Sequence, residues 1–149
     1  MRLMTEFPEQ RQMVIDEPGL IPKMTHEALR LVSPVITMRR TATQEAEIGE
    51  QRIAENEKVI MWYGAANRDP EVFENPDEVI LDRQHNRHVA FGAGIHRCAG
   101  SNLARMELRV AIETWIKRIP DFEIADAGGV TWAGGQVRAI NRESRITLS

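Results

Sequence analysis

The sequence predicts an α+β fold, and three observations support this prediction. Two segments near the start of the chain, at about 8–17 and 22–33, are bounded by prolines in the manner of short helices. Residues between about 35 and 63 include short runs rich in valine, isoleucine and threonine, which favour strands. A longer amphipathic helix is expected at about 99–118, before further short strands. No internal repeat, low-complexity tract or linker interrupts the chain, so a single structural unit is expected.

Prolines delimit the first two helices. Pro8 suits the first turn of a helix, where an amide hydrogen would have no intrahelical acceptor, and this helix is expected to end before Pro18. The second helix is expected to begin near Pro22 and to stop at Pro34.

Short strands are expected next, over 35–37, 47–48, 52–53 and 59–62. Gly49 marks the turn between the second and the third. Further along, Asp69 and the proline after it are expected to open a one-turn helix, since aspartate caps a helix and proline fits its first turn. The stretch around residue 76 has too little periodicity to predict regular structure.

The helix at about 99–118 has apolar residues at three-to-four-residue spacing, which predicts one buried stripe. These residues are Ala104, Leu108, Ala111, Ile112, Trp115, Ile116 and Ile119. After Pro120, short strands are expected, with turns at the glycine pairs 128–129 and 134–135.

The single cysteine, Cys98, lies in a glycine-rich loop at 91–100 that leads into this helix. The unpaired amides at a helix start and the charge of Arg97 favour a thiolate there. Gly92, Gly94 and Gly100 let the backbone turn sharply or approach a flat ligand closely. A soft thiolate with one open side is a good axial ligand for iron.

Other interpretations of Cys98 remain open on these residues alone. A lone cysteine is often a small buried hydrophobic residue. A nucleophile with His96 as its base is a second alternative, although side chains two residues apart in a turn diverge. Zinc would need more ligands than these two residues supply.

The loop sequence Phe-Gly-x-Gly-x-His-x-Cys-x-Gly resembles the heme-binding signature of the cytochrome P-450 superfamily. Two more segments match in order and spacing. Glu27 and Arg30 match the Glu-x-x-Arg motif, and 66–88 is similar to the short helix and meander of bacterial members. The resemblance covers the carboxy-terminal third of a complete domain, with residues 1–149 as its heme-ligand portion and the distal helix absent. The segment from Ala127 to Thr131 does not correspond to that distal helix. It follows Cys98 in the chain, and it lies among glycines that predict turns.

The resemblance implies a site as well as a fold. Cys98 would be the proximal ligand of heme b iron, and Phe91 would shield the sulfur. Arg40 and His96 would bind the heme propionates, and the backbone around Gly92 and Gly100 would contact the cofactor. The resemblance also implies a buried charge network and part of a substrate pocket. The network residues are Glu27, Arg30 and Arg83, and the pocket residues are Val35, Ile36 and Val137.

Two functions follow as expectations from the resemblance. The first is a heme-thiolate monooxygenase that inserts one oxygen atom from O2 into a small organic substrate, with electrons from a ferredoxin or its reductase. Arginines and lysines on the predicted helix at 99–118 would suit an acidic donor. The alternative is a truncated, non-catalytic fragment that binds heme weakly or needs the missing portion, with an exposed apolar face that invites self-association.

Composition agrees with a cytoplasmic protein of the bacterial type. The chain is 42% hydrophobic and 28% charged, as in ordinary globular proteins. The sequence contains no apolar run long enough to cross a bilayer and no signal-peptide pattern, so no membrane partner is expected. A net charge of -3 argues against nucleic acid as a partner.

Overall fold

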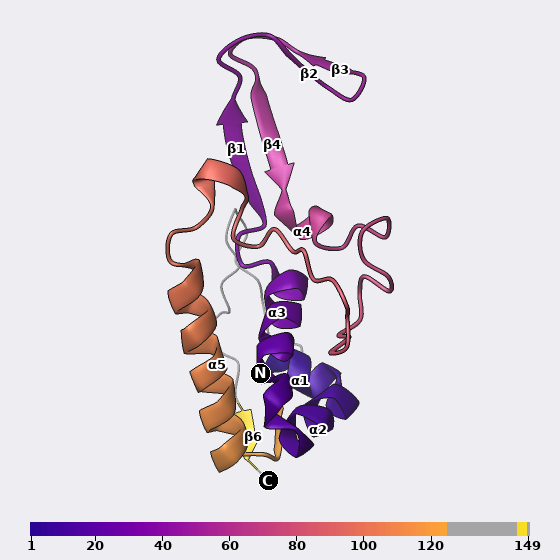
Figure 1. Cartoon of the computed structure of the whole chain (residues 1–149), viewed down its shortest axis with the longest axis vertical. Helices are drawn as coiled ribbons and strands as arrows, with labels where there is room; N and C mark the ends of the chain where they lie inside the picture. The colour runs from indigo at the N-terminus through magenta and orange to yellow at the C-terminus, as the bar shows by residue number, and fades with distance from the viewer. Residues whose placement is uncertain (125–145, 149) are drawn as a thin grey trace.

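The computed structural model describes residues 1–124 and 146–148 (Figure 1). In chain order the elements are α1 (Arg2–Glu6), α2 (Pro8–Asp16), the 3-10 helix η1 (Pro18–Leu20), α3 (Ile21–Val32), β1 (Thr37–Thr41), β2 (Ala46–Ile48), β3 (Gln51–Ile53), β4 (Lys58–Trp62), α4 (Tyr63–Ala66), the 3-10 helix η2 (Gly94–His96), α5 (Ser101–Arg118), β5 (Phe122–Ile124) and β6 (Ile146–Leu148). The helices α1, α2, α3 and α5 gather at one end, and a strand ribbon extends from the other (Figure 1). This arrangement is the α+β fold expected from the sequence.

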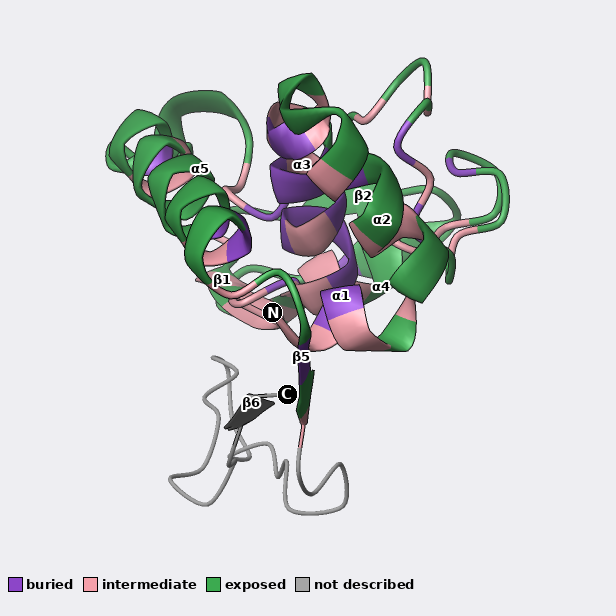
Figure 2. Cartoon of the chain, turned by 90° about the horizontal axis from the view of Figure 1, so that it is seen from below, coloured by how far each residue is buried: buried purple, intermediate pink, exposed green. Residues whose placement is uncertain are grey.

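The helix α3 is the buried centre of the helical part, as Figure 2 shows. It begins next to a proline, as expected, and ends at Ser33, whose left-handed backbone (φ 42°) breaks the helical path. The Ser33 amide still donates to Leu29 O at 3.0 Å, and its hydroxyl donates to Arg30 O at 2.8 Å. The chain therefore turns sharply from α3 toward β1.

The strands of the described residues form three separate two-stranded antiparallel sheets, ordered β1–β4, β2–β3 and β5–β6. In the first sheet Thr37 pairs with Trp62 and Arg40 with Val59. The β2–β3 turn contains Gly49 at φ +60°, as its position in the sequence predicted. The first strand was expected at 35–37 but begins at Thr37, so that prediction was wrong by two residues.

Among the described residues, one hydrophobic core joins the helices α1, α2, α3 and α5 to β5 and to the middle of the segment between α4 and η2. Its buried members are Leu3, Met4, Val14, Ile21, Met24, Leu31, Val79, Leu81, Ile112, Ile116 and Phe122. The helix α1, which the sequence analysis did not predict, contributes two of these side chains.

The buried stripe predicted for α5 is only partly present. Ile112 and Ile116 are buried, but Leu108 is 37% exposed and Ala111 is also exposed. The helix α5 is apolar on a second side as well, with Leu103, Met106 and Val110 each more than half exposed. Among the described residues the helix packs mainly against α3 along one side, and Figure 2 shows most of α5 exposed.

Residues 67–93 contain no regular element except turns. The expected one-turn helix at Asp69 is a hydrogen-bonded turn, in which the amides of Val72 and Phe73 donate to Asp69 O at 3.0 and 2.8 Å. Asp69 does cap it, because its side chain accepts from the Glu71 amide at 2.9 Å. The glycine-pair turns expected after Pro120 lie outside the described residues. Within the described part, none of the helices has the length and apolarity needed to cross a membrane.

Candidate functional site

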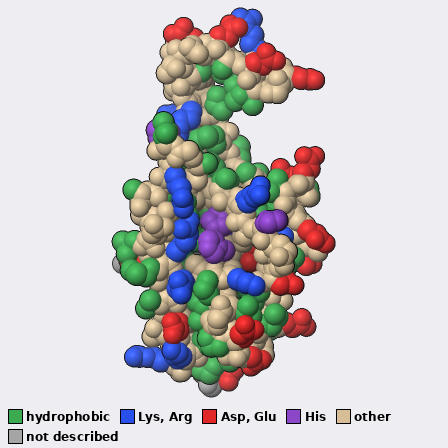
Figure 3. All heavy atoms as spheres, in the orientation of Figure 1, with side chains coloured by type: hydrophobic (Ala, Val, Ile, Leu, Met, Phe, Trp, Pro, Cys, Tyr) green, Lys and Arg blue, Asp and Glu red, His purple; other side chains and the backbone are tan. Residues whose placement is uncertain are grey.

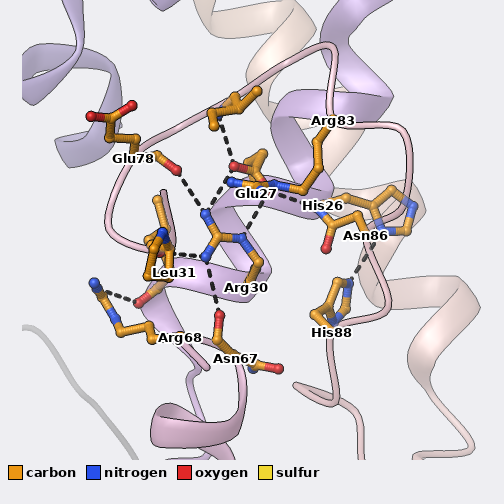
Figure 4. Close-up of polar contacts among 12 residues, drawn as sticks. His26, Glu27, Arg30, Leu31, Asn67, Arg68, Glu78, Arg83, Asn86 and His88 are labelled. Carbon is orange, nitrogen blue, oxygen red and sulfur yellow. Dashed lines mark hydrogen bonds and ion pairs between the residues drawn. The ribbon is translucent and has the colours of Figure 1, made fainter. Parts of the chain in front are cut away.

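Glu27 is the centre of a buried charge network on α3 (Figure 4). Its carboxylate accepts two parallel bonds from Arg30, Nε at 2.9 Å and Nη2 at 3.0 Å. Arg83 Nε, Asn86 Nδ2 and the Ile80 amide donate to the same carboxylate at 3.2, 2.8 and 2.8 Å. Burial by itself raises the pKa of Glu27, but the bonds from Arg30 and Ile80 and the charges of Arg30 and Arg83 hold that pKa below its ordinary value.

Arg30 ties the irregular segment to α3. Besides Glu27, it donates to the backbone oxygens of Asn67, Pro76 and Glu78, at 3.1, 2.5 and 2.7 Å. Its side chain has no solvent exposure. The guanidinium fork thus satisfies carbonyls that no strand or helix would otherwise pair.

Asn67 continues the network toward the cysteine loop. Its side chain donates to Ser33 Oγ at 2.8 Å and accepts from the Val89 amide at 2.7 Å. Asn67 is fully buried. The sequence analysis did not single it out, because its partners are 34 and 22 residues away in the chain.

Cys98 is exposed on the loop between η2 and α5, with its thiol free. Its amide donates to Phe91 O at 2.8 Å, which closes the loop. Gly92 and Gly94 have φ of +70° and +63°, so the predicted need for glycine at these two positions is a backbone requirement. A Cβ on Gly100 would lie 3.8 Å from Cys98 Sγ, so this backbone passes beside the sulfur.

An open cavity of about 280 Å³ lies between this loop, α3 and β1. Its lining consists of Leu29, Pro34, Val35, Met38, Arg40, Tyr63, Ala90, Phe91, Gly92, His96 and Cys98. The walls are largely apolar, and the polar groups Arg40, His96 and Cys98 converge on one space. Arg40 is half-buried, and within the described part of the chain its Nη1 donates to its neighbour Arg39 O at 3.0 Å, which leaves further guanidinium hydrogens for a ligand.

The cavity brings together most of the heme and pocket residues expected from the sequence, whereas the network residues lie outside it. Gly100 and Ile36 are not among its lining residues, and Ile36 instead lies against Gly64, whose amide donates to Ile36 O at 3.2 Å. Val137 lies outside the described residues. The sequence analysis missed Met38, although alternation along β1 puts it on the same face as Arg40.

Comparisons with known proteins identify the family of the chain. The family model described as Cytochrome P450 matches residues 15–124. Linalool 8-monooxygenase of Pseudomonas putida is 42% identical over 121 residues, which are 81% of this chain and 30% of that protein. The chain therefore belongs to the cytochrome P450 family.

Solved structures match the fold over nearly the whole chain. P450BioI, in complex with an acyl carrier protein ligated to hexadec-9Z-enoic acid, has a TM-score of 0.90 and 35% identity, and the match covers 98% of this chain and 37% of that one. Ligand-free cytochrome P450 TbtJ1 has a TM-score of 0.94 and 31% identity over 100% of this chain and 39% of that one. The chain thus spans about a third of the length of these relatives.

Family membership confirms the resemblance and the fold class, and with them the cofactor class of the family, heme b. The roles of single residues rest on the geometry of the cavity.

Proposed function

We propose that this chain provides the heme-thiolate portion of a cytochrome P450 monooxygenase, with Cys98 as the proximal iron ligand. The observation that carries the proposal is the convergence of Cys98, Arg40 and His96 on one largely apolar cavity. These residues fit heme b. The Cys98 thiolate is a soft ligand for iron, and the apolar walls suit a flat macrocycle. Arg40 and His96 can donate hydrogen bonds to the heme carboxylates. Phe91 and Gly92 both line this cavity, and Gly92 has a φ of +70° that a residue with a side chain rarely adopts.

Each residue of the chain has a distinct role in this proposal. Cys98 holds the iron, and Phe91 keeps water from one side of the sulfur. Arg40 and His96 orient the ring through its propionates. The amide hydrogens near Gly100 lower the charge on the sulfur by hydrogen bonding. When bound, heme supplies the activation of O2 from which one oxygen atom enters an organic substrate.

Of the described residues proposed for the substrate region, Val35 is the one that lines the cavity. Ile36 and Val137 belong to the proposed region as well, although Ile36 does not line this cavity. The chemistry of an apolar wall indicates a small organic substrate with an apolar part.

The electron donor is proposed to dock over α5 near the cysteine loop. The cationic residues there are Arg97, Arg105, Arg109, Lys117 and Arg118, against the acids Glu107 and Glu113. Figure 3 shows Lys and Arg side chains gathered in a column on this face. Such a surface steers an acidic partner such as a ferredoxin. The lone cysteine, needed here as a free thiol, suits the reducing cytoplasm.

A second candidate function is a non-catalytic fragment that acts only with the rest of a P450 domain. The observation that favours it is the exposed apolar side of α5, where Met106, Val110 and Trp115 border an open groove of about 700 Å³. A soluble domain rarely leaves such a groove uncovered. We therefore propose that residues 1–149 form the heme-ligand portion of a domain whose remaining portion covers this groove, including Glu107 and Arg118 on its lining, and leaves Arg97, Arg105 and Arg109 for the donor.

Heme titration tests the proposal. Purified protein is mixed with heme, and the absorbance spectrum of the reduced carbon monoxide complex is compared with that of Cys98→Ala. We expect a thiolate-type Soret band that the variant loses, while the variant Arg40→Gln binds heme more weakly but keeps the thiolate band. Absence of any Soret band in the unsubstituted chain would rule out heme binding by these residues alone.

A further inference from the structure

Two histidines from distant parts of the chain meet beside the cysteine loop (Figure 4). His26 Nδ1, on α3, lies 3.2 Å from His88 Nε2, which precedes the loop by only a few residues. Their ring centroids are 5.4 Å apart at an angle of 46°. Both side chains are half-buried, and Figure 3 shows a group of histidine side chains at the centre of that face, bordered by Lys and Arg.

The hydrogen bonds determine where the ring protons lie. The Ala90 amide points at His88 Nδ1 at 3.3 Å, and because an amide can only donate, this nitrogen must carry no proton. Neutral His88 therefore carries its proton on Nε2 and donates it to His26 Nδ1. The result is a directed chain: the Ala90 amide donates to His88, and His88 donates to His26.

This chain of bonds requires both rings to be uncharged. A proton on His88 Nδ1 would face the Ala90 amide hydrogen, and a proton on His26 Nδ1 would face the His88 Nε2 hydrogen. The surroundings favour the neutral rings, since burial, the charge of His26, and the charges of Arg105 and Arg30 lower the pKa of His88 to about 4, with Glu27 opposing them. Burial and Arg105 also lower the pKa of His26.

Ala90 connects the histidines to Cys98. It lies in the turn closed by the Gly92 amide on Val89 O at 2.8 Å, and the carbonyl of Phe91 in the same turn accepts from the Cys98 amide at 2.8 Å. The Phe91 ring lies between His88, at 6.1 Å between centroids, and Arg105, whose Cζ is 5.2 Å from its centre. A charged His88 would therefore place two cations around Phe91.

We propose that the neutral His26–His88 pair is a proton-sensitive latch that positions the turn at 88–92 and, through it, Cys98. His26 is a positioning residue, not a catalytic one: it touches neither the cavity nor Cys98. When the pair takes up a proton, the turn loses this tie to α3 and keeps the one through Asn67, which accepts from the Val89 amide, so the Cys98 loop loosens. The effect of the latch on heme rests on the proposed function. Its hydrogen bonds lie within the chain and do not depend on heme.

Nuclear magnetic resonance on the ¹⁵N-labelled full chain tests the latch without heme. We expect both histidines to carry their protons on Nε2 at pH 8. The amides of Ala90 and Cys98 should exchange with solvent about fivefold faster in His26→Leu, which has no acceptor, than in His26→Gln, whose amide oxygen replaces it. His85→Gln, at an exposed histidine outside the pair, should match the unsubstituted chain.

The pH dependence gives a second, independent readout. In the unsubstituted chain, protection of the two amides should fall as His88 is protonated at acid pH. In His26→Gln the charge of His26 no longer opposes this step, so the loss should move to higher pH. A His88 proton on Nδ1 at pH 8, or equal exchange in the Leu and Gln variants, would overturn the latch.

The heme-loaded chain separates this result from the proposed function. If the thiolate-type carbon monoxide band declines along the same pH profile as the amide protection, the latch acts on the iron ligand. If no variant binds heme but the exchange rates differ as expected, the latch stands and the heme function fails. If heme binds through Cys98 and the Leu and Gln variants are alike, the function stands and the latch fails.

Discussion

At the scale of single residues, Glu27 determines how the site is held together. Its carboxylate is 1% exposed, yet it accepts hydrogen bonds from two arginines, an asparagine and a backbone amide. Such a charge is stable only while its partners remain, and they in turn depend on it. The network joins α3 to the segment that leads into the cysteine loop, so its loss would affect both stability and the cavity.

Glu27→Gln tests this dependence. We expect a loss of about 3–5 kcal/mol in the free energy of unfolding, because Arg30 and Arg83 become buried charges without an anion. The measurement is a urea unfolding curve at pH 7. The matched control is Glu113→Gln, which removes an exposed pair with Lys117 and should leave the free energy of unfolding nearly unchanged.

The pH dependence of that difference has a defined sign. Because the folded pKa of Glu27 is lowered, its contribution is complete above its unfolded pKa and is lost as pH falls through the folded value. The unfolding free energies of Glu27→Gln and of the unsubstituted chain should therefore converge as the pH falls. Equal stability of Glu27→Gln and Glu113→Gln at pH 7 would contradict the role given to the network.

At the scale of elements, the sequence predicted the helices and turns that depend on local rules, such as the position of prolines and glycines. Prolines and helical spacing placed α2, α3 and α5 within a few residues, and glycines marked the turns at Gly49, Gly92 and Gly94. The contacts of Asn67 and His88 were not predictable, since they join residues 22 to 62 positions apart. Arg40 and His96 were identified only through the family resemblance, because spacing alone says nothing of a cavity formed by a strand and a loop.

Gly92→Ala tests whether backbone conformation determines the loop. A Cβ there would meet His96 O at 3.5 Å and Tyr63 Oη at 3.6 Å, which is ordinary contact, so the strain comes from the left-handed φ of +70°. We expect about 1–2 kcal/mol of destabilisation by urea unfolding and faster reaction of Cys98 with a thiol reagent. Gly19→Ala, where φ is not positive, serves as the control and should change neither the stability nor the reaction rate of Cys98. A similar loss of stability in the two variants would mean that removing any glycine has this effect.

At the scale of the whole molecule, the exposed side of α5 determines how the isolated chain behaves in solution. Leu103, Met106 and Val110 are 54%, 57% and 57% exposed and recur at helical spacing, beside a groove that also includes Ala111. Apolar side chains at this spacing are the pattern by which two helices pack, and a small residue such as Ala111 allows close approach. Where the rest of a P450 domain is not present to cover this groove, the apolar side of α5 on a second copy of the chain can cover it instead.

The 149-residue chain alone should therefore self-associate at micromolar concentration, and Val110→Glu should shift it toward the monomer in sedimentation velocity runs. A buried glutamate without a partner is costly, whereas the same residue is well solvated in the monomer, so the substitution acts on the associated state. Ile95→Glu is the matched control, because Ile95 is 96% exposed and lies outside the groove. If both variants shift the equilibrium equally, net charge and not the α5 face governs association. If Val110→Glu alone shifts it, the groove is the surface that a complete domain must cover.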